Sequence, residues 1–358
     1  MTDMRFEDLR GYGYDLPSEL IRRTGVEPRD SARLFVYDTK TDAVVHDIFS
    51  NLANHLPEKS LMVLNDTRVV PARLWLRKET GGKIEVFVLA NEWDGNPENV
   101  PVLVDRKCVP GMRLFFPDGN HFEVVRQEEN RFFARLVFSG VTAENGLEQL
   151  LDWYGETPVP HYLEGDGKFE ESELRKRYQT VFAKAGASVA APTASLHFTE
   201  RVFGSLDRKG IDIAKVTLDV GLGTFAPLRE ENFLTKKLHR ERIDVSLRTA
   251  DELNEAKRKG RPIIAVGTTA LRTLETVVGN GEFRTYSGPT DIFIFPPHEF
   301  RSADALLTNF HLPETSLMLL VDAFLGWKGA RRRIMPLYEE AIRERYAFYS
   351  FGDSMLII

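Results

Sequence analysis

Buried-strand segments that are each followed by a helical segment constrain the fold of this chain more than any other feature. Residues 262–266 form an apolar run ahead of a helical pattern at 270–278, and residues 305–310 precede another at 316–325. Repeated strand–helix units produce a sheet that is covered by helices. We therefore predict an α/β fold whose larger domain has a distorted, barrel-like mixed sheet with surrounding helices.

The segment between residues 84 and 138 has a different pattern. Short β-branched and aromatic runs are separated by Gly, Asn, Pro and Asp, which is typical of antiparallel strands joined by turns. The three expected strands are residues 84–89, 122–125 and 131–138. Their spacing predicts a small antiparallel β-barrel at residues 68–150. Because strand–helix patterns flank it, we predict that this barrel is inserted into a larger domain made of residues 1–67 and 151–358.

Length and composition limit the class of protein. With 358 residues, 42% hydrophobic and 28% charged, the chain can bury the cores of about two domains. A single cysteine, Cys108, excludes an internal disulfide, and eight dispersed histidines show no zinc-site spacing, so no metal is expected. The N-terminus lacks a signal-peptide pattern, and the apolar run at 317–325 is shorter than the roughly 20 residues that span a bilayer. We expect a cytoplasmic protein without membrane contact.

Charge is distributed unevenly along the chain. A formal net charge of −6 argues against a protein that coats nucleic acid without selectivity, because such binding needs many lysine and arginine contacts to phosphates. Two basic runs nevertheless stand out, at residues 236–242 and 328–333. Taken alone, a run of this kind more often forms a solvated surface than a binding face.

One helix is marked at both ends. Thr249 and Glu252 have the spacing of a capping box, in which each side chain bonds the backbone N–H of the other residue. Gly260 is of the residue type that most often ends a helix in the left-handed conformation. The pattern predicts a helix that begins at Thr249 and ends just before Gly260.

The loop at residues 221–226 matches the G-x-G-x-x-A pattern of dinucleotide-binding sites, with Glu241 about 20 residues further on. A proline follows immediately and no apolar helical stripe comes next, so a nicotinamide dehydrogenase is disfavoured. We interpret Gly221 and Gly223 as positions where the backbone turns tightly or approaches a ligand, with the Thr224 hydroxyl nearby.

Gly267, Thr268 and Thr269 stand between the expected strand at 262–266 and the helix that follows it. Free backbone N–H groups at a helix N-terminus suit a ribose, a carboxylate or a phosphate. An equally good interpretation is that the two threonines are simple N-caps. The sequence contains no ATP-type phosphate loop.

Two histidines are candidates for a general base. His197 lies in the small-residue segment 190–199, just before a helix that Thr199 could cap, and His311 lies in Asn-Phe-His-Leu-Pro at the end of a strand. Histidine has an unperturbed pKa near neutrality, which suits proton transfer. A lone histidine beside apolar residues is, however, more often a packing residue.

Asn65, Asp66, Thr67 and Arg68 place four polar groups at the end of an apolar strand at 61–64. Such a cluster suits recognition of a polar ligand, but it also fits an Asx-type turn with a surface ion pair. Polar groups at strand ends line the pockets of α/β folds, so these segments together predict a pocket.

The segments described above match, in order, the signature blocks of the S-adenosylmethionine:tRNA ribosyltransferase-isomerase family, which this chain resembles. The matching blocks are residues 64–74, 81–85, 177–181, 190–193 with 196–199, 223–225, 265–269, 290–294, 308–313 and 351–353. Two positions depart from the family pattern: Ser195 stands where glycine is usual, and Asp219 where histidine is usual. These departures bear on substrate preference, not on the family.

The resemblance implies an enzyme that transfers and isomerises the ribosyl moiety of S-adenosylmethionine onto 7-aminomethyl-7-deazaguanine at the wobble position of tRNA. The products are epoxyqueuosine, adenine and methionine. The resemblance implies no true cofactor, because S-adenosylmethionine is the ribosyl-donor substrate, and the larger domain is then the catalytic one. The family's proposed route needs a base for a C5′ proton, a stabiliser of departing adenine and a group that recognises the amino acid. We expect a monomer.

Roles in this reaction are assigned from side-chain chemistry. His197 is the leading base, His311 and Asp66 are further catalytic candidates, and Arg68 or Arg272 is the expected partner of the methionine carboxylate. The expected substrate-binding residues are Asn65, Arg68, Pro192, Thr193, Gly221, Gly223, Thr224, Gly267, Thr268, Thr269, Arg272 and Asn309, and the expected tRNA-binding residues are Lys236, Lys237, Arg240 and Arg242.

Two other functions stay open at this point. A catalytically silent RNA-binding relative, in which Ser195 and Asp219 mark a decayed site, would bind tRNA without turnover. An S-adenosylmethionine-dependent methyltransferase would form S-adenosylhomocysteine. The methyltransferase is disfavoured because no glycine-rich loop opens a doubly wound fold near the N-terminus.

Overall fold

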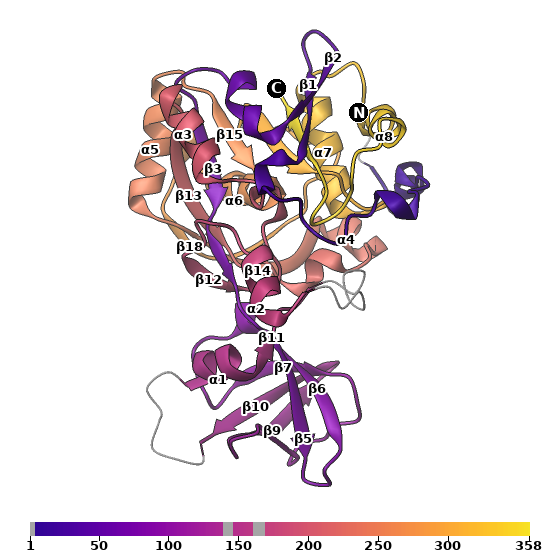
Figure 1. Ribbon diagram of the computed structural model, residues 1–358, viewed down its shortest axis with the longest axis vertical. Coiled ribbons are helices and arrows are strands. Elements are labelled where there is room, and N and C mark those ends of the chain that lie inside the picture. Colours follow the sequence, from indigo (N-terminus) through magenta and orange to yellow (C-terminus); the bar gives the residue numbers. More distant parts are fainter. Residues whose placement is uncertain (1–3, 139–145, 160–168) are drawn as a thin grey trace.

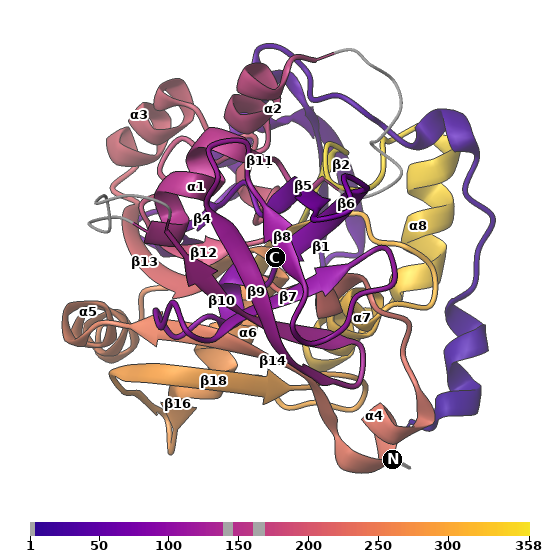
Figure 2. The same ribbon diagram turned by 90° about the horizontal axis from the view of Figure 1, so that it is seen from below.

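The computed structural model describes residues 4–138, 146–159 and 169–358, without the side chains of Thr224 and Phe225. Figure 1 shows a larger body of sheet and helices above a smaller β-rich lobe. Figure 2 looks at the molecule from the lobe end, with the strands of the lobe in front of the body. The predicted mixed α/β class is confirmed.

A nine-stranded mixed sheet forms the centre of the larger body. In spatial order its strands are β18 (Tyr286–Ile292), β14 (Lys237–Val245), β13 (Asp212–Leu218), β3 (Leu61–Asn65), β15 (Ile263–Val266), β19 (Ala305–Asn309), β20 (Ser354–Ile357), β1 (Arg33–Asp38) and β2 (Ala43–Ile48). The four central strands β13, β3, β15 and β19 are parallel to their neighbours in this group. Their carboxyl ends therefore meet at one edge of the sheet.

Helices cover both faces of this sheet, which explains why β3, β15 and β19 are buried along their whole length. The helices of the body are α2 (Glu171–Arg177), α3 (Glu200–Arg208), α4 (Glu230–Thr235), α5 (Leu247–Arg258), α6 (Gly267–Val277), α7 (Ser316–Trp327) and α8 (Ile334–Arg343). Val63 and its neighbours on one face pack with α5, α6 and α7, and Met62 on the other face packs with α3 and η4 (Phe49–His55). A strand that is buried on both faces reads as a continuous hydrophobic run.

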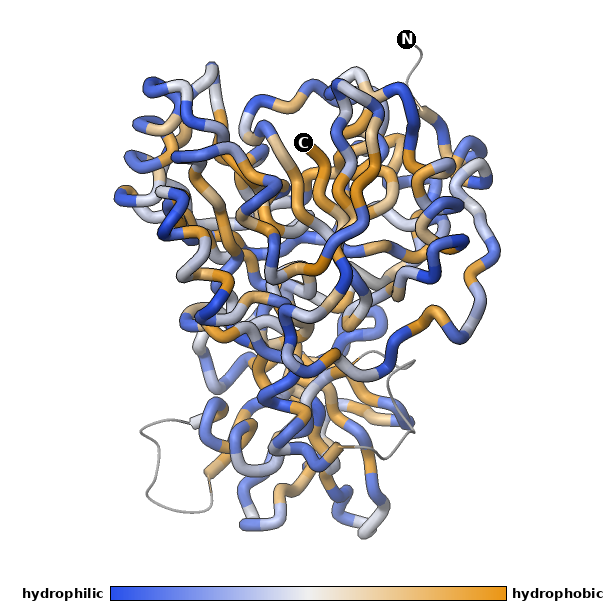
Figure 3. The backbone as a smooth tube through the Cα atoms, turned by 45° about the horizontal axis from the view of Figure 1, so that its top comes forward, coloured by the Kyte–Doolittle hydropathy of each residue, from blue (hydrophilic) through white to orange (hydrophobic). Residues whose placement is uncertain are grey.

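Hydropathy along the chain agrees with this arrangement, since hydrophobic segments gather in the middle of the body and hydrophilic segments lie outside (Figure 3). Across the part of the chain that the structure describes, no helix combines the length and the apolar character needed to cross a bilayer. The most apolar helix, α7, buries Asp322, which accepts hydrogen bonds from Tyr12 and Arg333.

The smaller lobe is built from antiparallel strands. They are, in spatial order, β11 (Gly155–Glu156), β5 (Arg73–Lys78), β6 (Lys83–Val88), β7 (Val100–Val104), β10 (Arg131–Val137), β9 (His121–Glu128) and β8 (Arg113–Phe115). The three strands that the sequence predicts here are present as β6, β9 and β10. Because β5 also pairs with β8, the strands β5, β6, β7, β10, β9 and β8 form a closed circuit. This circuit surrounds a separate hydrophobic core.

The chain leaves the lobe near the predicted boundary at residue 150. Helix α1 (Gly146–Tyr154) contains that residue and contacts β5 and β11, and β11 still pairs with β5. Where the chain enters the lobe, β4 (Thr67–Val69) pairs in parallel with β12 (Ala185–Ser188), which follows the return to the body. A further short pair joins β16 (Val278–Gly279) to β17 (Glu282–Phe283).

The predicted helix caps can be compared one by one with the helix ends in the structure. Thr199 is the N-cap of α3, as predicted, because its hydroxyl accepts a hydrogen bond from Val202 N. The predicted start of α5 is wrong, because its N-cap is Ser246, whose hydroxyl accepts from Thr249 N at 3.1 Å. The predicted end of α5 is confirmed, since Gly260 follows it with φ +63°.

Candidate functional site

A cavity of about 120 Å³ opens at the carboxyl ends of β15 and β19. Polar groups were expected at this edge of the sheet, where α/β folds bind ligands. Seven of the predicted site residues line the cavity: Pro192, Thr193, Gly267, Thr268, Thr269, Asn309 and His311. We call this the strand-end cavity.

Local sequence explains the shape of the strand-end cavity. Strand β15 stops at Val266 because Gly267 has φ +85°, a left-handed conformation that a residue with a Cβ rarely adopts, and α6 starts there. The turn brings Thr268 and Thr269 into the cavity wall. Within the described part of the chain, the buried Thr269 hydroxyl has no hydrogen-bond partner. That hydroxyl is therefore free to bond a ligand.

Thr193 and Asn309, which both line the cavity, are joined by a side-chain hydrogen bond. Thr193 Oγ1 donates to Asn309 Oδ1 at 2.9 Å, which fixes the amide at the end of β19. Asn309 lies in the strand predicted at residues 305–310, and Thr193 lies in the predicted small-residue segment 190–199. The contact shows that two segments separated by more than a hundred residues in sequence form one wall.

His311 belongs to the cavity wall. Its ring nitrogens lie 3.4 Å from Tyr338 Oη and 3.4 Å from Thr308 Oγ1, both long for hydrogen bonds. Burial lowers the pKa of His311 to about 3. The imidazole is therefore neutral near pH 7, and its nitrogens are only weakly held.

His197 lies elsewhere and is firmly held. It is 3% exposed, packs against Phe49, and its ring nitrogens lie 2.9 Å from Gly352 O and 3.2 Å from Arg29 O. Burial lowers the pKa of His197, although the nearby Asp353 carboxylate and the two carbonyls act to raise it. It does not line the strand-end cavity. His197 therefore packs between its own segment and the segments of Arg29 and Gly352. This position does not favour His197 as the leading base.

The polar cluster at residues 65–68 also lies outside the strand-end cavity. The Asn65 amide bonds both the N–H and the carbonyl of Leu218, at 2.9 and 3.0 Å, and thereby extends the pairing of β3 with β13. Asp66 accepts from Thr217 Oγ1 at 2.8 Å. Arg68 is partly exposed and shows no hydrogen bond or ion pair to any residue that the structure describes. The cluster anchors the connection to the smaller lobe.

Asp219, one of the two departures from the family pattern, completes this anchor. Its Oδ1 accepts from Thr67 Oγ1 and from Ala187 N, both at 2.9 Å. Burial raises the pKa of Asp219. A Cβ on Gly186 would lie 2.0 Å from the same carboxylate oxygen, and Gly186 has φ +74°. The sequence reasoning missed Gly186, a glycine between two alanines in β12.

Arg272 makes a buried ion pair, which lies away from the cavity wall. The Arg272 guanidinium is 3% exposed and donates from Nη1 to Glu241 Oε2, while its Nε and Nη2 have no partner among the described residues. Glu241 Oε1 lies 3.2 Å from both Gly221 N and His239 Nε2. Burial alone would raise the pKa of Glu241, but Arg272 and His239 outweigh it and hold that pKa at about 2.

The glycines of the 221–226 loop make room for side chains of this protein. A Cβ on Gly221 would lie 2.8 Å from Asn91 Nδ2, and one on Gly223 would lie 2.2 Å from the His239 ring. Both glycines therefore allow side chains of this protein to approach closely, whereas their residue type predicted a tight turn or the approach of a ligand. Thr224 lies in the short helix η8 (Leu222–Phe225), and its side chain is outside the described part of the structure.

The predicted tRNA-binding residues follow one element, β14 and the turn before it. Lys236 ends α4 with φ +55°, and Lys237 Nζ lies 2.9 Å from Asp291 Oδ2. Arg240 and Arg242 alternate with buried residues on the exposed face of β14 and line an open crevice of about 340 Å³ beside Asn91 of the smaller lobe.

The second basic run has a different environment. Arg331 and Arg332 pair with Asp42, Arg332 also pairs with Glu340, and Arg333 pairs with Asp322. Its arginines thus stabilise the fold around α7 and α8. Within the described ranges, no group of three or more His, Cys, Asp and Glu side chains is arranged to hold a metal ion.

Comparison with known proteins places this geometry in a family. Residues 9–357 match the family described as "Queuosine biosynthesis protein". The S-adenosylmethionine:tRNA ribosyltransferase-isomerases of Carboxydothermus hydrogenoformans and Acetivibrio thermocellus are 42% and 44% identical to this chain, over 98% and 96% of its length and 99% and 98% of theirs. The crystal structure of S-adenosylmethionine tRNA ribosyltransferase from Thermotoga maritima is 32% identical, covers 97% of this chain and 99% of that chain, and has a TM-score of 0.53. This chain therefore belongs to the queuosine biosynthesis family of S-adenosylmethionine:tRNA ribosyltransferase-isomerases.

Proposed function

We propose that this chain transfers and isomerises the ribosyl moiety of S-adenosylmethionine onto 7-aminomethyl-7-deazaguanine at the wobble position of tRNA, forming epoxyqueuosine and releasing adenine and methionine. Similarity over nearly the whole length to enzymes of that name carries the proposal. The strand-end cavity supports it, because seven residues expected from the family blocks converge there. S-adenosylmethionine is then a substrate, and no further cofactor is required.

The strand-end cavity suits the ribosyl part of the donor. Its volume of about 120 Å³ is below the roughly 300 Å³ of sites for drug-sized ligands, so the adenine and methionine portions would extend beyond it. Thr268, Thr269 and Asn309 offer hydroxyl and amide groups to ribose hydroxyls, and the first turn of α6 offers backbone N–H groups. Of the two predicted arginines, Arg68 has no ion partner in the described structure and Arg272 is paired with Glu241, so Arg68 is the one we assign to the carboxylate.

His311 is the base that this geometry favours. A neutral imidazole in the cavity wall can accept the C5′ proton, whose acidity the adjacent sulfonium increases. The proton that His311 accepts could then be delivered to departing adenine, which needs a proton to leave. His197 would then position the segments around Gly352 and Arg29. Asp66 would hold the connection to the smaller lobe.

The smaller lobe and β14 are proposed to receive the tRNA. We treat residues 68–150 as an inserted β-barrel domain, supported by the strand circuit and the separate core, with the catalytic domain formed by residues 1–67 and 151–358. Arg240 and Arg242 line the crevice between β14 and Asn91 of that lobe. The tRNA substrate itself supports a cytoplasmic location, and a monomer is sufficient because all of these groups come from one chain.

Release of adenine and methionine is the direct test. Incubation of the protein with S-adenosylmethionine and tRNA carrying 7-aminomethyl-7-deazaguanine should release both products and yield epoxyqueuosine, measured by mass spectrometry of the nucleosides. A control tRNA with unmodified guanine should give none. S-adenosylhomocysteine together with methylated RNA would instead identify a methyltransferase, and tRNA binding without turnover would identify a silent relative.

Neutralising the basic residues on β14 should weaken tRNA binding. Changing Lys236, Lys237 and Arg240 to Gln removes up to three phosphate contacts, and each lost contact lowers the slope of log affinity against log salt by about one unit. Filter binding across a salt series measures both quantities. The control is the same number of changes at Arg248, Arg258 and Lys259 on α5, where exposed cations lie away from this crevice. An unchanged affinity and slope in the β14 variant would show only a solvated surface.

A further inference from the structure

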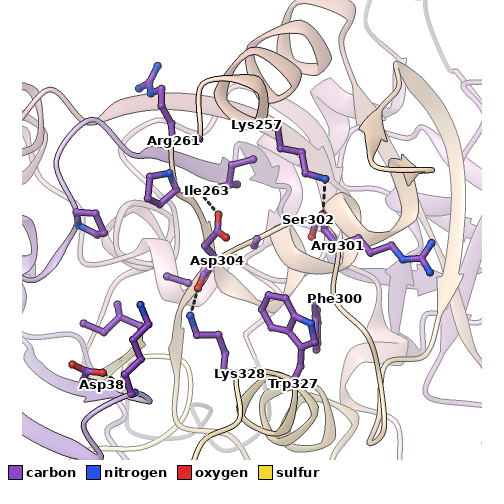
Figure 4. Close-up of a pocket in the computed structure, with 17 residues that line it drawn as sticks. Asp38, Lys257, Arg261, Ile263, Phe300, Arg301, Ser302, Asp304, Trp327 and Lys328 are labelled. Carbon is purple, nitrogen blue, oxygen red and sulfur yellow. Dashed lines mark hydrogen bonds between the residues drawn. The ribbon is translucent and has the colours of Figure 1, made fainter.

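A second cavity, of about 550 Å³, lies at the amino ends of β15 and β19. The strand-end cavity lies at their carboxyl ends, so the sheet separates the two. Figure 4 shows the side chains around this second cavity, which we call the amino-edge cavity. They come from the ends of α5 and α7, from the loop before β19 and from the turn after β1. None of them has a role in the proposed reaction.

Positive charge dominates the lining of the amino-edge cavity. Five basic side chains and two acidic ones line it, in a chain whose formal net charge is −6. Both carboxylates accept hydrogen bonds from the backbone: Asp38 from Lys40 N and Thr41 N, and Asp304 from Ile263 N. The carboxylates are thus engaged in shaping the walls.

Two lysines in the lining keep donors for a ligand. Lys257 Nζ donates to Gly281 O and to Arg301 O, and Lys328 Nζ donates to Asp304 O, each at 2.9 Å. An ammonium group has three N–H donors, so one remains on Lys257 and two remain on Lys328. Among the described residues, the hydrogen-bond partners of both ammonium groups are backbone carbonyls, and neither lysine forms an ion pair. Burial lowers the pKa of Lys328, although Asp304 and Asp38 act to raise it, and a bound anion would further offset the cost of burying its charge.

An exposed aromatic ring stands beside these lysines. Trp327 is 37% exposed at the end of α7, although it packs against Phe300 and Phe324 with ring centroids 5.6 and 5.5 Å away. In Figure 4 the Trp327 ring lies beside Lys328, with Phe300 on its other side. A ring that is held on one side and open on the other is a platform on which a base can stack.

We propose that the amino-edge cavity binds a nucleotide unit, with its base on Trp327, its phosphate at the ammonium group of the adjacent Lys328, and Lys257 adding positive charge to the same cavity. The combination of a fixed aromatic ring and ammonium donors matches the two chemical parts of a nucleotide. The unit is either a free nucleotide or an unpaired nucleotide of an RNA, since both present the same base and phosphate. This site is separate from the proposed reaction, and its test needs no turnover.

Binding of guanosine 5′-monophosphate by the full-length protein tests the proposal. Saturating S-adenosylmethionine occupies the strand-end cavity, so equilibrium dialysis reports the second cavity. Trp327→Leu should weaken binding about tenfold, in line with the loss of one stacked base. Lys328→Gln and Lys257→Gln should each weaken it several-fold and reduce its salt dependence. The matched controls, Trp153→Leu and Lys259→Gln, change an exposed tryptophan and an exposed lysine outside the cavity and should leave affinity unchanged.

The same variants distinguish the two sources of the nucleotide. If the occupant is part of an RNA, Trp327→Leu and Lys328→Gln also weaken tRNA binding, and the mononucleotide competes with tRNA. If it is free, tRNA binding stays unchanged. Thermal unfolding checks that Trp327→Leu is folded, and the two lysine variants test the site independently of aromatic packing. Affinities equal to those of the controls for both ligands would overturn the proposal, whereas adenine release at saturating substrates should persist in every variant.

Discussion

His311→Ala is expected to remain folded and to lose turnover by about 10²- to 10⁴-fold, the usual contribution of a positioned general base. The expectation rests on its place in the strand-end cavity and on ring nitrogens held only by 3.4 Å contacts. Single-turnover formation of epoxyqueuosine measures the chemical step, and the Kd for S-adenosylmethionine should change much less than the rate.

His197→Ala is the matched comparison for this prediction. Because the neutral His197 ring donates one hydrogen bond, best placed toward Gly352 O at 2.9 Å, and packs on Phe49, its removal should lower the free energy of unfolding by about 1–3 kcal/mol. Its rate loss should follow the unfolded fraction measured by thermal unfolding. A stable His197→Ala protein with a selective loss of single-turnover rate would return the role of base to His197, and normal chemistry in His311→Ala would remove it from His311.

Patterns that depend on burial were readable in the sequence. β3, β15 and β19 are covered on both faces, so each appears as an uninterrupted apolar run, and their polar ends predicted a pocket at one edge. Gly267 fixed the turn from β15 into α6. Seven predicted residues line the strand-end cavity, whereas the polar end of β3 lies outside it.

Tertiary contacts decided the features that the sequence could not show. Thr249 looks like an N-cap, yet its hydroxyl donates to Lys215 O on β13, and Ser246 caps the helix instead. Both residues are good N-caps by type, so only the packing of α5 on the sheet separates them. The same holds for His197, whose partners at Arg29 and Gly352 are more than 150 residues away in the sequence.

The cluster at residues 65–68 shows that tertiary contacts can give a polar motif a structural role that its spacing does not reveal. Its residue types suit ligand binding, but Thr67 and Asn65 meet Asp219 and Leu218, about 150 residues further along the chain, when β4 pairs with β12. A spacing pattern carries no information about such a pairing. Gly186 was the available signal, because a left-handed glycine inside a strand indicates close approach of another group.

Replacing Arg272 by methionine should destabilise the protein by about 3–5 kcal/mol, because it leaves the buried Glu241 carboxylate without its cation. The pKa of Glu241, held at about 2 by Arg272 and His239, would rise once Arg272 is gone. Stability of the variant should then increase as the pH falls from 7 toward 5, since protonation relieves the buried charge. Urea unfolding at several pH values measures this.

A second change separates the charge of Arg272 from its packing. Glu241→Gln in the Arg272→Met background removes the unpaired charge and keeps the acceptor for Gly221 N, so it should restore most of the lost stability at pH 7. Arg248→Met is the matched control: its side chain is 88% exposed and pairs with Glu252 one turn away, and its loss should cost under about 1 kcal/mol. If Arg272→Met unfolds no more easily than Arg248→Met, the Arg272 guanidinium does not stabilise the core. Its unbonded Nε and Nη2 would then be better explained by a role in binding the carboxylate of the donor.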